Sequence, residues 1–248
     1  MIPHYKETIL HISTEDMIEV DRLMIEDYGI DLVRMMENAG NNLAILVSRL
    51  CLRGKPFGKK VIVIAGSGGN GGGVLVAARR LHNWGADVKI VLVAEPGKLK
   101  DVTKQQYEIL KKMGVPFQDG IDEDAGVIID GMIGYGIQGN PKGRFKELIE
   151  QINTSHIPVV SLDTPSGLNL TSGIPGNPTV KAKATLTLAL PKTGLFKHKA
   201  SKYVGDIYLA DISVPPGLFK KIGIEDKSLG RMFSSGTVVK INKVVVFS

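Results

Sequence analysis

The sequence predicts an α/β fold in which helices cover both faces of a mostly parallel sheet. Between residues 61 and 163, short apolar runs alternate with segments of helical spacing, which is typical of strand–helix–strand units. No long linker, internal repeat or break in composition divides the 248 residues. Hydrophobic residues make up 43% and charged residues 23%, as in globular proteins, and a chain this long can bury a full core.

The individual elements follow from periodicity and from capping residues. Apolar positions at helical spacing predict a helix over residues 14–28, which Gly29 ends, and Asp31 is placed to cap a second helix that runs to about Leu52. We predict strands at 61–65, 88–94, 127–130, 158–163, 184–190 and 207–210, and further helices at 70–84, 102–113 and 144–152. We expect one domain over residues 1–225 and a C-terminal extension over 226–248, including the run 244–247.

Composition limits where the protein acts. The single cysteine, Cys51, cannot form a disulfide within the chain, which suits a reducing compartment. The first ten residues lack the apolar run of a signal peptide, and the longest apolar stretches fall far short of the ~20 residues that span a bilayer. We therefore expect a soluble, cytoplasmic protein with no membrane partner.

The net charge of +6 is unevenly distributed. No acidic residue occurs between Asp163 and Asp206, whereas six lysines do: Lys181, Lys183, Lys192, Lys197, Lys199 and Lys202. A local positive field of this kind attracts phosphate groups. A solvated basic surface without a specific partner is the alternative interpretation.

A glycine-rich loop follows the first predicted strand of the alternating region and opens a helix. Residues 66–73 match the pattern G-x-G-x-x-G through Gly66, Gly68 and Gly71. Glycines let backbone amides approach a phosphate, and a helix N-terminus adds partial positive charge. The loop therefore predicts a dinucleotide site, although a tight turn that packs the helix on the strand would also need glycine.

Two further loops, residues 130–136 and 163–167, follow predicted strands and open with aspartate. Because ligands of parallel sheets bind at the carboxyl ends of the strands, we expect Asp130 and Asp163 to face one pocket. A carboxylate there can act as a general base or bind a cation. Asn70, Asp130 and Ser166 offer only oxygen ligands, which suits a hard cation.

Several segments together resemble one known family. The sequence MENAG at 36–40, the three loops, LPKTGL at 190–195 and ADISVPP at 210–216 are similar, in order, to motifs of the N-terminal YjeF domain family, the NAD(P)H-hydrate epimerases. The resemblance covers about residues 10–225. It implies a Rossmann-like three-layer α/β/α domain, usually a homodimer.

The resemblance also implies an isomerase activity and its residues. Family members interconvert the R and S epimers of hydrated NADH and NADPH (NADHX and NADPHX) at the hydrated nicotinamide carbon, so that a separate dehydratase can restore the cofactor. By position, Asp163 is the catalytic residue, and Asn70, Asp130 and Ser166 bind one potassium ion per subunit. The implied ligand-binding residues are Gly68, Gly69, Asn70, Gly71, Gly72, Gly73, Gly134, Tyr135, Gly136, Ile137, Gln138, Gly139, Asn140 and Asp163.

Four positions depart from the family pattern. Gly69 replaces an Asn, Gly73 replaces an Asp, Val74 replaces a Gly, and Tyr135 replaces a Thr. Because the glycine loop lacks that Asp, the alternative function is a non-catalytic scaffold that binds a nucleotide or RNA. A nicotinamide-dependent oxidoreductase, favoured only by the glycine spacing, is a third hypothesis.

Overall fold

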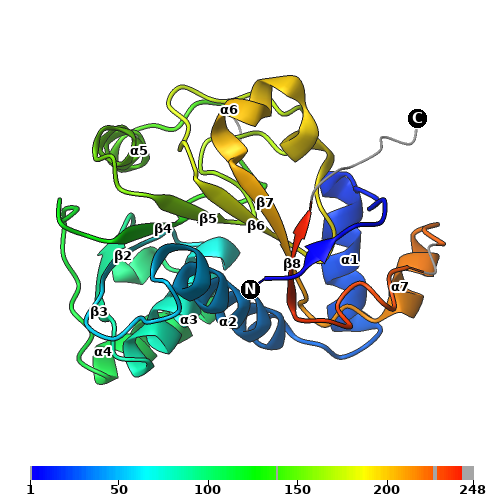
Figure 1. Cartoon of the computed structure of the whole chain (residues 1–248), viewed down its shortest axis with the longest axis horizontal. Helices are drawn as coiled ribbons and strands as arrows, with labels where there is room; N and C mark the ends of the chain where they lie inside the picture. The colour runs from blue at the N-terminus through cyan, green and yellow to red at the C-terminus, as the bar shows by residue number, and fades with distance from the viewer. Residues whose placement is uncertain (1, 138, 226–227, 242–248) are drawn as a thin grey trace.

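The computed structural model of the chain describes residues 2–137, 139–225 and 228–241. Within these residues, eight strands form one sheet in the spatial order β1-β8-β7-β6-β5-β4-β2-β3 (Figure 1). Neighbouring strands are parallel except β7 and β8. The strands are β1 (His4–Tyr5), β2 (Lys60–Ala65), β3 (Asp87–Leu92), β4 (Val127–Gly131), β5 (Val159–Leu162), β6 (Ala184–Leu188), β7 (Asp206–Ala210) and β8 (Val238–Ile241).

The five long helices begin and end within two residues of the predicted bounds, whereas the two short helices Ser201–Val204 and Pro216–Lys221 were not predicted. Ser13 and Asp16 form a reciprocal capping box at the start of α1, and Asp31 accepts a hydrogen bond of 2.9 Å from the backbone nitrogen of Arg34 to cap α2. Gly29 has φ of +64° in the turn between them. The helices are α1 (Thr14–Glu26), α2 (Leu32–Cys51), α3 (Gly69–Asn83), α4 (Asp101–Lys112), α5 (Arg144–Thr154), α6 (Ser201–Val204) and α7 (Pro216–Lys221).

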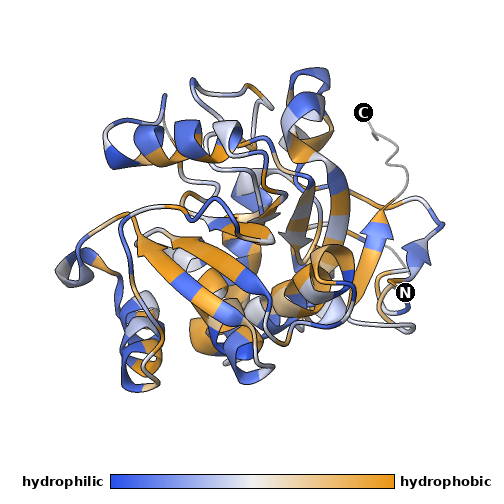
Figure 2. Cartoon of the chain, turned by 60° about the vertical axis from the view of Figure 1, so that its left-hand side comes forward, coloured by the Kyte–Doolittle hydropathy of each residue, from blue (hydrophilic) through white to orange (hydrophobic). Residues whose placement is uncertain are grey.

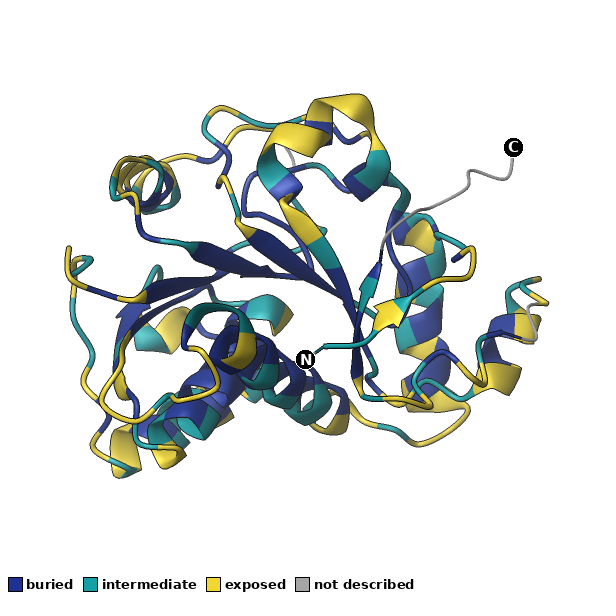
Figure 3. Cartoon of the chain, viewed as in Figure 1, coloured by how far each residue is buried: buried dark blue, intermediate teal, exposed yellow. Residues whose placement is uncertain are grey.

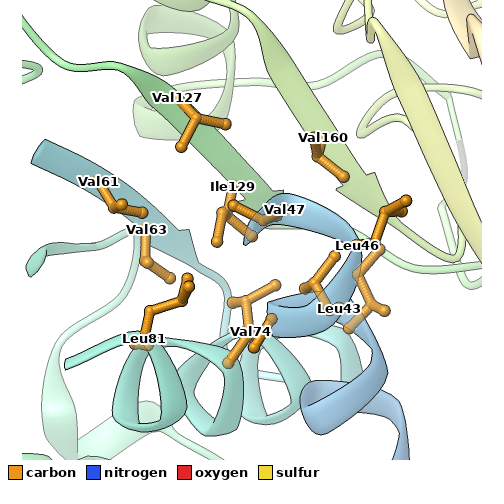
Figure 4. Packing of buried hydrophobic residues seen from close by; sticks show 14 of the residues in the cluster. Leu43, Leu46, Val47, Val61, Val63, Val74, Leu81, Val127, Ile129 and Val160 are labelled. Atoms are coloured by element: carbon orange, nitrogen blue, oxygen red, sulfur yellow. The ribbon is translucent and has the colours of Figure 1, made fainter. Parts of the chain in front are cut away.

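Alternating side chains of the central strands bury both faces of the sheet. In β2, Val61 and Val63 pack in one apolar cluster with α2 and α3, whereas Ile62 and Ile64 pack on the other face with α5. Figure 4 shows the first cluster between β2, β4, β5 and the two helices. The central strands are buried throughout (Figure 3), and the surrounding helices carry both hydrophobic and hydrophilic residues (Figure 2). The predicted three-layer α/β/α arrangement is confirmed.

Every helix and strand that the sequence predicts is present, with ends within two residues of the expected ones. The short strands β1 and β8 were not predicted, because strands of two and four residues are too short to show a periodic pattern. β8 lies beyond residue 225 and pairs with β7 and β1. The division into a domain and an extension stays a prediction, and residues 244–247 lie outside the described part of the chain.

The sheet changes winding direction between β2 and β4. The chain passes from β2 to β3 on one side, then crosses back to place β4 on the other side of β2. The helices follow this change, because α3 packs on one face of the sheet and α5 on the other (Figure 1). Ligands of open α/β sheets bind at such a switch point, outside the carboxyl ends of the strands.

Candidate active site

A cavity of about 330 Å³ lies beside this switch point. Its polar walls come from residues that follow β2, β4, β5 and β6, and its apolar wall comes from α1 and α2. The lining residues are Met17, Asp21, Ile25, Leu32, Met35, Met36, Ala39, Gly69, Asn70, Gly73, Lys100, Val102, Tyr135, Leu162, Asp163, Leu188, Lys192 and Ile212. All three predicted loops therefore meet here: the first contributes Asn70, the second Tyr135 and the third Asp163.

The predicted catalytic residue, Asp163, forms a buried ion pair at this cavity. Lys192 Nζ donates to Asp163 Oδ1 over 2.6 Å, and the lysine side chain is fully buried. The hydroxyl of Thr187 (3.1 Å) and the backbone nitrogen of Leu188 (3.3 Å) donate to the same oxygen. Among the described residues, no hydrogen bond goes to Asp163 Oδ2, so this oxygen remains available to a ligand.

The backbone holds Asp163 in an uncommon conformation. Its φ is +62°, in the left-handed region that aspartate and asparagine tolerate better than other non-glycine residues. Such backbone strain persists where the surrounding structure enforces it, and it clusters at functional sites. Here the enforcing contacts are the hydrogen bonds that the carboxylate accepts and the bond from its own nitrogen to the carbonyl of Leu186, at 2.7 Å.

The sequence interpretation placed Lys192 with a basic surface, and this is wrong. Lys192 is buried and donates to Asp163 and to the carbonyl oxygen of Leu188 at 2.9 Å. A run of lysines without acidic neighbours gave no sign that one of them is turned inward. The other members of the run are exposed: Lys181, Lys183, Lys197, Lys199 and Lys202.

Asp130 is fully buried behind the cavity and is held by hydrogen-bond donors from two loops. Its carboxylate accepts bonds from Ser166 Oγ (2.5 Å), Ser166 N (2.9 Å), Ser161 Oγ (2.8 Å) and Met132 N (3.2 Å). Burial raises its pKa, and these four bonds lower it, with burial the larger effect. Asp130 and Ser166, two of the three predicted cation ligands, are thus in direct contact.

Asn70, the third predicted cation ligand, lies in the first turn of α3. Its Nδ2 donates to the carbonyl oxygen of Leu162 over 2.8 Å, which ties the glycine loop to the end of β5. Its side chain also lies against Gly134 in the second loop, since a Cβ built on that glycine would come within 3.2 Å of it. Among the described residues, no hydrogen bond is donated to its Oδ1. Asn70 therefore joins all three loops and keeps an amide oxygen available.

The glycines of the first loop have two different roles in the structure. Gly71 and Gly72 are buried, and a Cβ on them would overlap the carbonyl oxygen of Gly66 and the side chain of Met36, respectively. Gly68 and Gly69 have open space where a Cβ would be. Gly73 lines the cavity in helical conformation, and a Cβ there would come within 2.6 Å of Leu162 Cδ2. Gly71 and Gly72 are therefore needed for close packing, whereas Gly69 lies at the open edge of the cavity.

The second predicted ligand-binding stretch is only partly at the cavity. Tyr135 lines it, and Gly134 lies beside Asn70. Gly136, Ile137, Gly139 and Asn140 are not among its lining residues; Asn140 instead accepts a bond of 2.9 Å from the backbone nitrogen of Asn177. Gln138 lies outside the described residues.

Tyr135 forms a second polar contact at the cavity. Its hydroxyl donates to Asp21 Oδ2 of α1 over 3.2 Å. Burial raises the pKa of Asp21 to about 6, although the charge of Lys192 and the bond from Tyr135 oppose this shift. Burial also raises the pKa of Tyr135 to about 12. The cavity therefore holds two carboxylates, two lysine side chains, one phenol and one amide on walls that are otherwise apolar or glycine.

The family model described as YjeF-related protein N-terminus matches residues 33–194, which include α2, the three loops and the Asp163–Lys192 pair. The chain belongs to this family. It is 37% identical to the NAD(P)H-hydrate epimerase of Dehalogenimonas lykanthroporepellens, over 95% of this chain and 94% of that protein. It is 32% identical to the NAD(P)H-hydrate epimerase of Rhodopirellula baltica, over 83% of this chain and 85% of that protein.

Two further matches extend the family comparison. A bifunctional NAD(P)H-hydrate repair enzyme from Thermofilum pendens is 36% identical over 81% of this chain, but the match spans only 40% of that longer protein. A crystal structure of a yeast protein superposes with a TM-score of 0.76 at 25% identity, covering 95% of this chain and all of that one. The family fold thus extends over nearly the whole chain.

Two charged residues that line the cavity, Asp21 and Lys192, were missed from the sequence as site residues. Lys192 lies within a segment, residues 190–195, that resembles the family, and this was the available signal. Asp21 lies in an amphipathic helix with several other acidic residues, and no local pattern separates it from them.

In the described part of the chain, no helix is long and apolar enough to cross a membrane. Among the same residues, no group of three or more His, Cys, Asp or Glu side chains could hold a metal ion.

The open space at Gly69 allows a direct test of ligand approach. We expect Gly69→Ala to fold normally, because its Cβ meets no protein atom, but to weaken nucleotide binding about 10-fold, or ~1.4 kcal/mol, by blocking the cavity edge. The matched control is Gly97→Ala, which also has open space but lies away from the cavity. Titration calorimetry measures both. Equal affinity in the two variants would show that no ligand approaches Gly69.

Proposed function

We propose that this protein is an NAD(P)H-hydrate epimerase, an isomerase that interconverts the R and S epimers of NADHX and NADPHX. The observation that carries the proposal is the buried Asp163–Lys192 pair beside a cavity at the switch point, in a chain whose relatives bear that name. The named relatives favour this function over an RNA-binding scaffold or an oxidoreductase.

The reaction needs proton transfer at one carbon. The hydrated carbon carries a hydroxyl group and is bonded to the ring nitrogen, so removal of the hydroxyl proton allows the C–N bond to open and a carbonyl to form. Closure on the other face of the carbonyl gives the opposite epimer. Asp163 Oδ2 is the available base, and Lys192 keeps Asp163 oriented through Oδ1.

The pyrophosphate would lie at the N-terminus of α3. The backbone amides of Gly69, Asn70 and Gly71 are the first of a 15-residue helix, where amides have no acceptor within the helix. Together with the helix dipole they favour an anion. Gly69 is exposed at this end and provides access for the phosphate. Of the predicted stretch 134–140, Gly134 and Tyr135 are the residues placed to contact the remainder of the ligand.

The donor set of Asn70, Asp130 and Ser166 fits a potassium ion. Asp130 is a buried carboxylate, and among the described ion pairs none includes it. A monovalent cation bound by its oxygens, by Ser166 Oγ and by the free Asn70 Oδ1 would compensate that charge and link the three loops. This ion would compensate the buried charge of Asp130 and would take no part in proton transfer.

Potassium should therefore affect stability as well as activity. We expect the thermal midpoint to be higher in potassium than in tetramethylammonium chloride at equal ionic strength, because the ion binds only the folded protein. Asp130→Asn should abolish that difference, since it removes the charge that holds the ion. Differential scanning fluorimetry measures both proteins. If potassium raises the thermal midpoint of the variant as much as that of the wild type, the ion is bound elsewhere.

The direct test of the function is conversion of one epimer into the other. Purified protein is mixed with R-enriched NADHX, and chromatography follows the S epimer over time. We expect conversion well above the spontaneous rate and no change in redox state, whereas an oxidoreductase would need a partner substrate. No acceleration with NADHX or NADPHX would overturn the proposal.

The wild-type residue Gly73 should suffice for this reaction. The cavity already holds a second carboxylate, Asp21, so we expect Gly73→Asp to leave the epimerisation rate within about 3-fold of the wild type, well below the ~10²–10⁴-fold effect of a general acid or base. The backbone at Gly73 is helical and accepts Asp, although Leu162 must move to make room. A rate increase of ~100-fold would show that the missing loop carboxylate limits the natural protein.

We further propose that the protein is a homodimer in the cytoplasm and works with a separate dehydratase. In the bifunctional NAD(P)H-hydrate repair enzymes of Thermofilum pendens and Moorella thermoacetica, the region that matches this chain spans only about 40% of the protein. The free cysteine Cys51, only partly buried, fits a reducing compartment. RNA binding is a weaker candidate, because Lys192 is buried away from the basic surface.

A further inference from the structure

Asp21 places a carboxylate on a wall of the cavity that is otherwise apolar. The neighbouring residues that α1 contributes to this wall are Met17 and Ile25. Asp21 is half-buried, and burial is the largest influence on its pKa, which rises to about 6. Removing a carboxylate from water costs free energy unless its charge is compensated.

No structural task explains this cost. The cap of α1 is formed by Ser13 and Asp16, so Asp21 is not needed to start the helix. Among the described ion pairs none includes Asp21, because Lys192 donates to Asp163 instead. The only hydrogen bond that the described residues give to Asp21 comes from Tyr135, itself a lining residue of the cavity. Both members of the contact thus face the substrate space.

The proposed reaction needs two proton-transfer groups, and Asp163 provides one. When the C–N bond of the hydrated ring opens, the hydroxyl loses a proton and the ring nitrogen gains one. A base and an acid that both reach the ring are therefore required. Asp163 is suited to be the base, because Lys192 donates to its Oδ1 and no described residue donates to its Oδ2, which can therefore reach the ring.

We propose that Asp21 is the second catalytic residue of this cavity, the acid that protonates the ring nitrogen, and that Tyr135 is its positioning residue. This inference rests on the proposed epimerase function. Asp163 takes the hydroxyl proton, the O–H electron pair forms the carbonyl, the C–N pair passes to nitrogen, and Asp21 donates a proton to it. Closure on the other face returns both protons, so no oxidant, reductant or net proton is consumed.

The groups around Asp21 determine the pH dependence. Asp163, at the end of β5, raises the pKa of Asp21; Lys192, after β6, and the hydroxyl of Tyr135, after β4, lower it. Lys100, before α4, also lines the cavity. Since Asp21 must be protonated to act as the acid, kcat/KM should fall as the pH rises above about 6.

Three variants test the inference through pH–rate profiles of the full chain. We expect Asp21→Asn to lower kcat by ~10²-fold or more, with little change in KM, and to remove the fall above pH 6. Tyr135→Phe removes a bond that lowers the pKa of Asp21, so the fall should move to higher pH. Glu19→Gln, an exposed residue of the same helix that pairs with Arg22, is the control and should behave as the wild type.

Folding and function are controlled separately. Equal thermal midpoints and equal nucleotide affinity in Asp21→Asn and the wild type show that the cavity is intact. If the wild type converts the epimers no faster than the spontaneous rate, the epimerase proposal itself is wrong. An active wild type whose rate and pH profile are unchanged by Asp21→Asn overturns only the role of Asp21, as does a Tyr135→Phe profile that does not move.

Discussion

Asp163→Asn is expected to lower the rate of NADHX epimerisation by ~10²–10⁴-fold, the usual contribution of a general base. Asparagine is the appropriate substitution, because it tolerates the left-handed backbone at φ of +62° and keeps an oxygen to accept the bond from Thr187. The variant leaves the buried ammonium of Lys192 without its counterion, which typically costs about 3–5 kcal/mol, so urea denaturation must show that the protein is folded under the assay conditions. The measurement is the chromatographic assay of epimer conversion at saturating substrate.

A control separates lost chemistry from lost structure in this variant. Asp122→Asn removes a partly buried carboxylate that pairs with Lys89 and does not line the cavity, and it should leave the rate unchanged. If Asp163→Asn retains more than about a tenth of the wild-type rate, Asp163 is not the base.

Lys192→Met should have the largest effect on stability. It leaves the carboxylate of Asp163 buried without its counterion, which typically costs about 3–5 kcal/mol, and it removes donors to Asp163 and Leu188. We expect the free energy of unfolding, measured by urea denaturation, to fall by that amount. Activity should also be lost, because the ammonium no longer orients the carboxylate.

The double variant Asp163→Asn/Lys192→Met shows whether the lost stability comes from the unpaired charge. With both charges absent, the protein should recover a large part of the stability that Lys192→Met loses, while activity stays absent. A double variant as unstable as Lys192→Met alone would assign the loss to packing around the lysine stem instead.

The sequence predicted the sheet and its helices well because both have strong local signals. Buried β-branched strands such as residues 61–65, the helix stop at Gly29 and the cap at Asp31 can be recognised within a few neighbouring residues. The alternation of strands and helices predicted a parallel sheet, but the strand order that creates the switch point came only from the structure. The strand β8 could not be predicted, because its pairing with β7 joins segments separated by more than 25 residues.

Site residues that follow the end of a strand could be predicted from the sequence. Site residues that reach the cavity only through tertiary packing could not. Asp163 follows an apolar strand next to a glycine-containing turn, and sequence analysis identified it from that position. Lys192 and Asp21 have no such local mark, since one is buried within a basic run and the other lies on a helix with several charges. Their proximity to Asp163 exists only in three dimensions.

The close contact between the first two loops has a thermodynamic consequence. Gly66 donates its backbone nitrogen to the carbonyl oxygen of Gly131, and a side chain on either residue would collide with the opposite loop or the helix beside it. The two loops are therefore fixed against each other before any ligand arrives. Little conformational entropy is left to lose on binding, so the affinity gained from each phosphate contact is retained instead of being spent on ordering the loops.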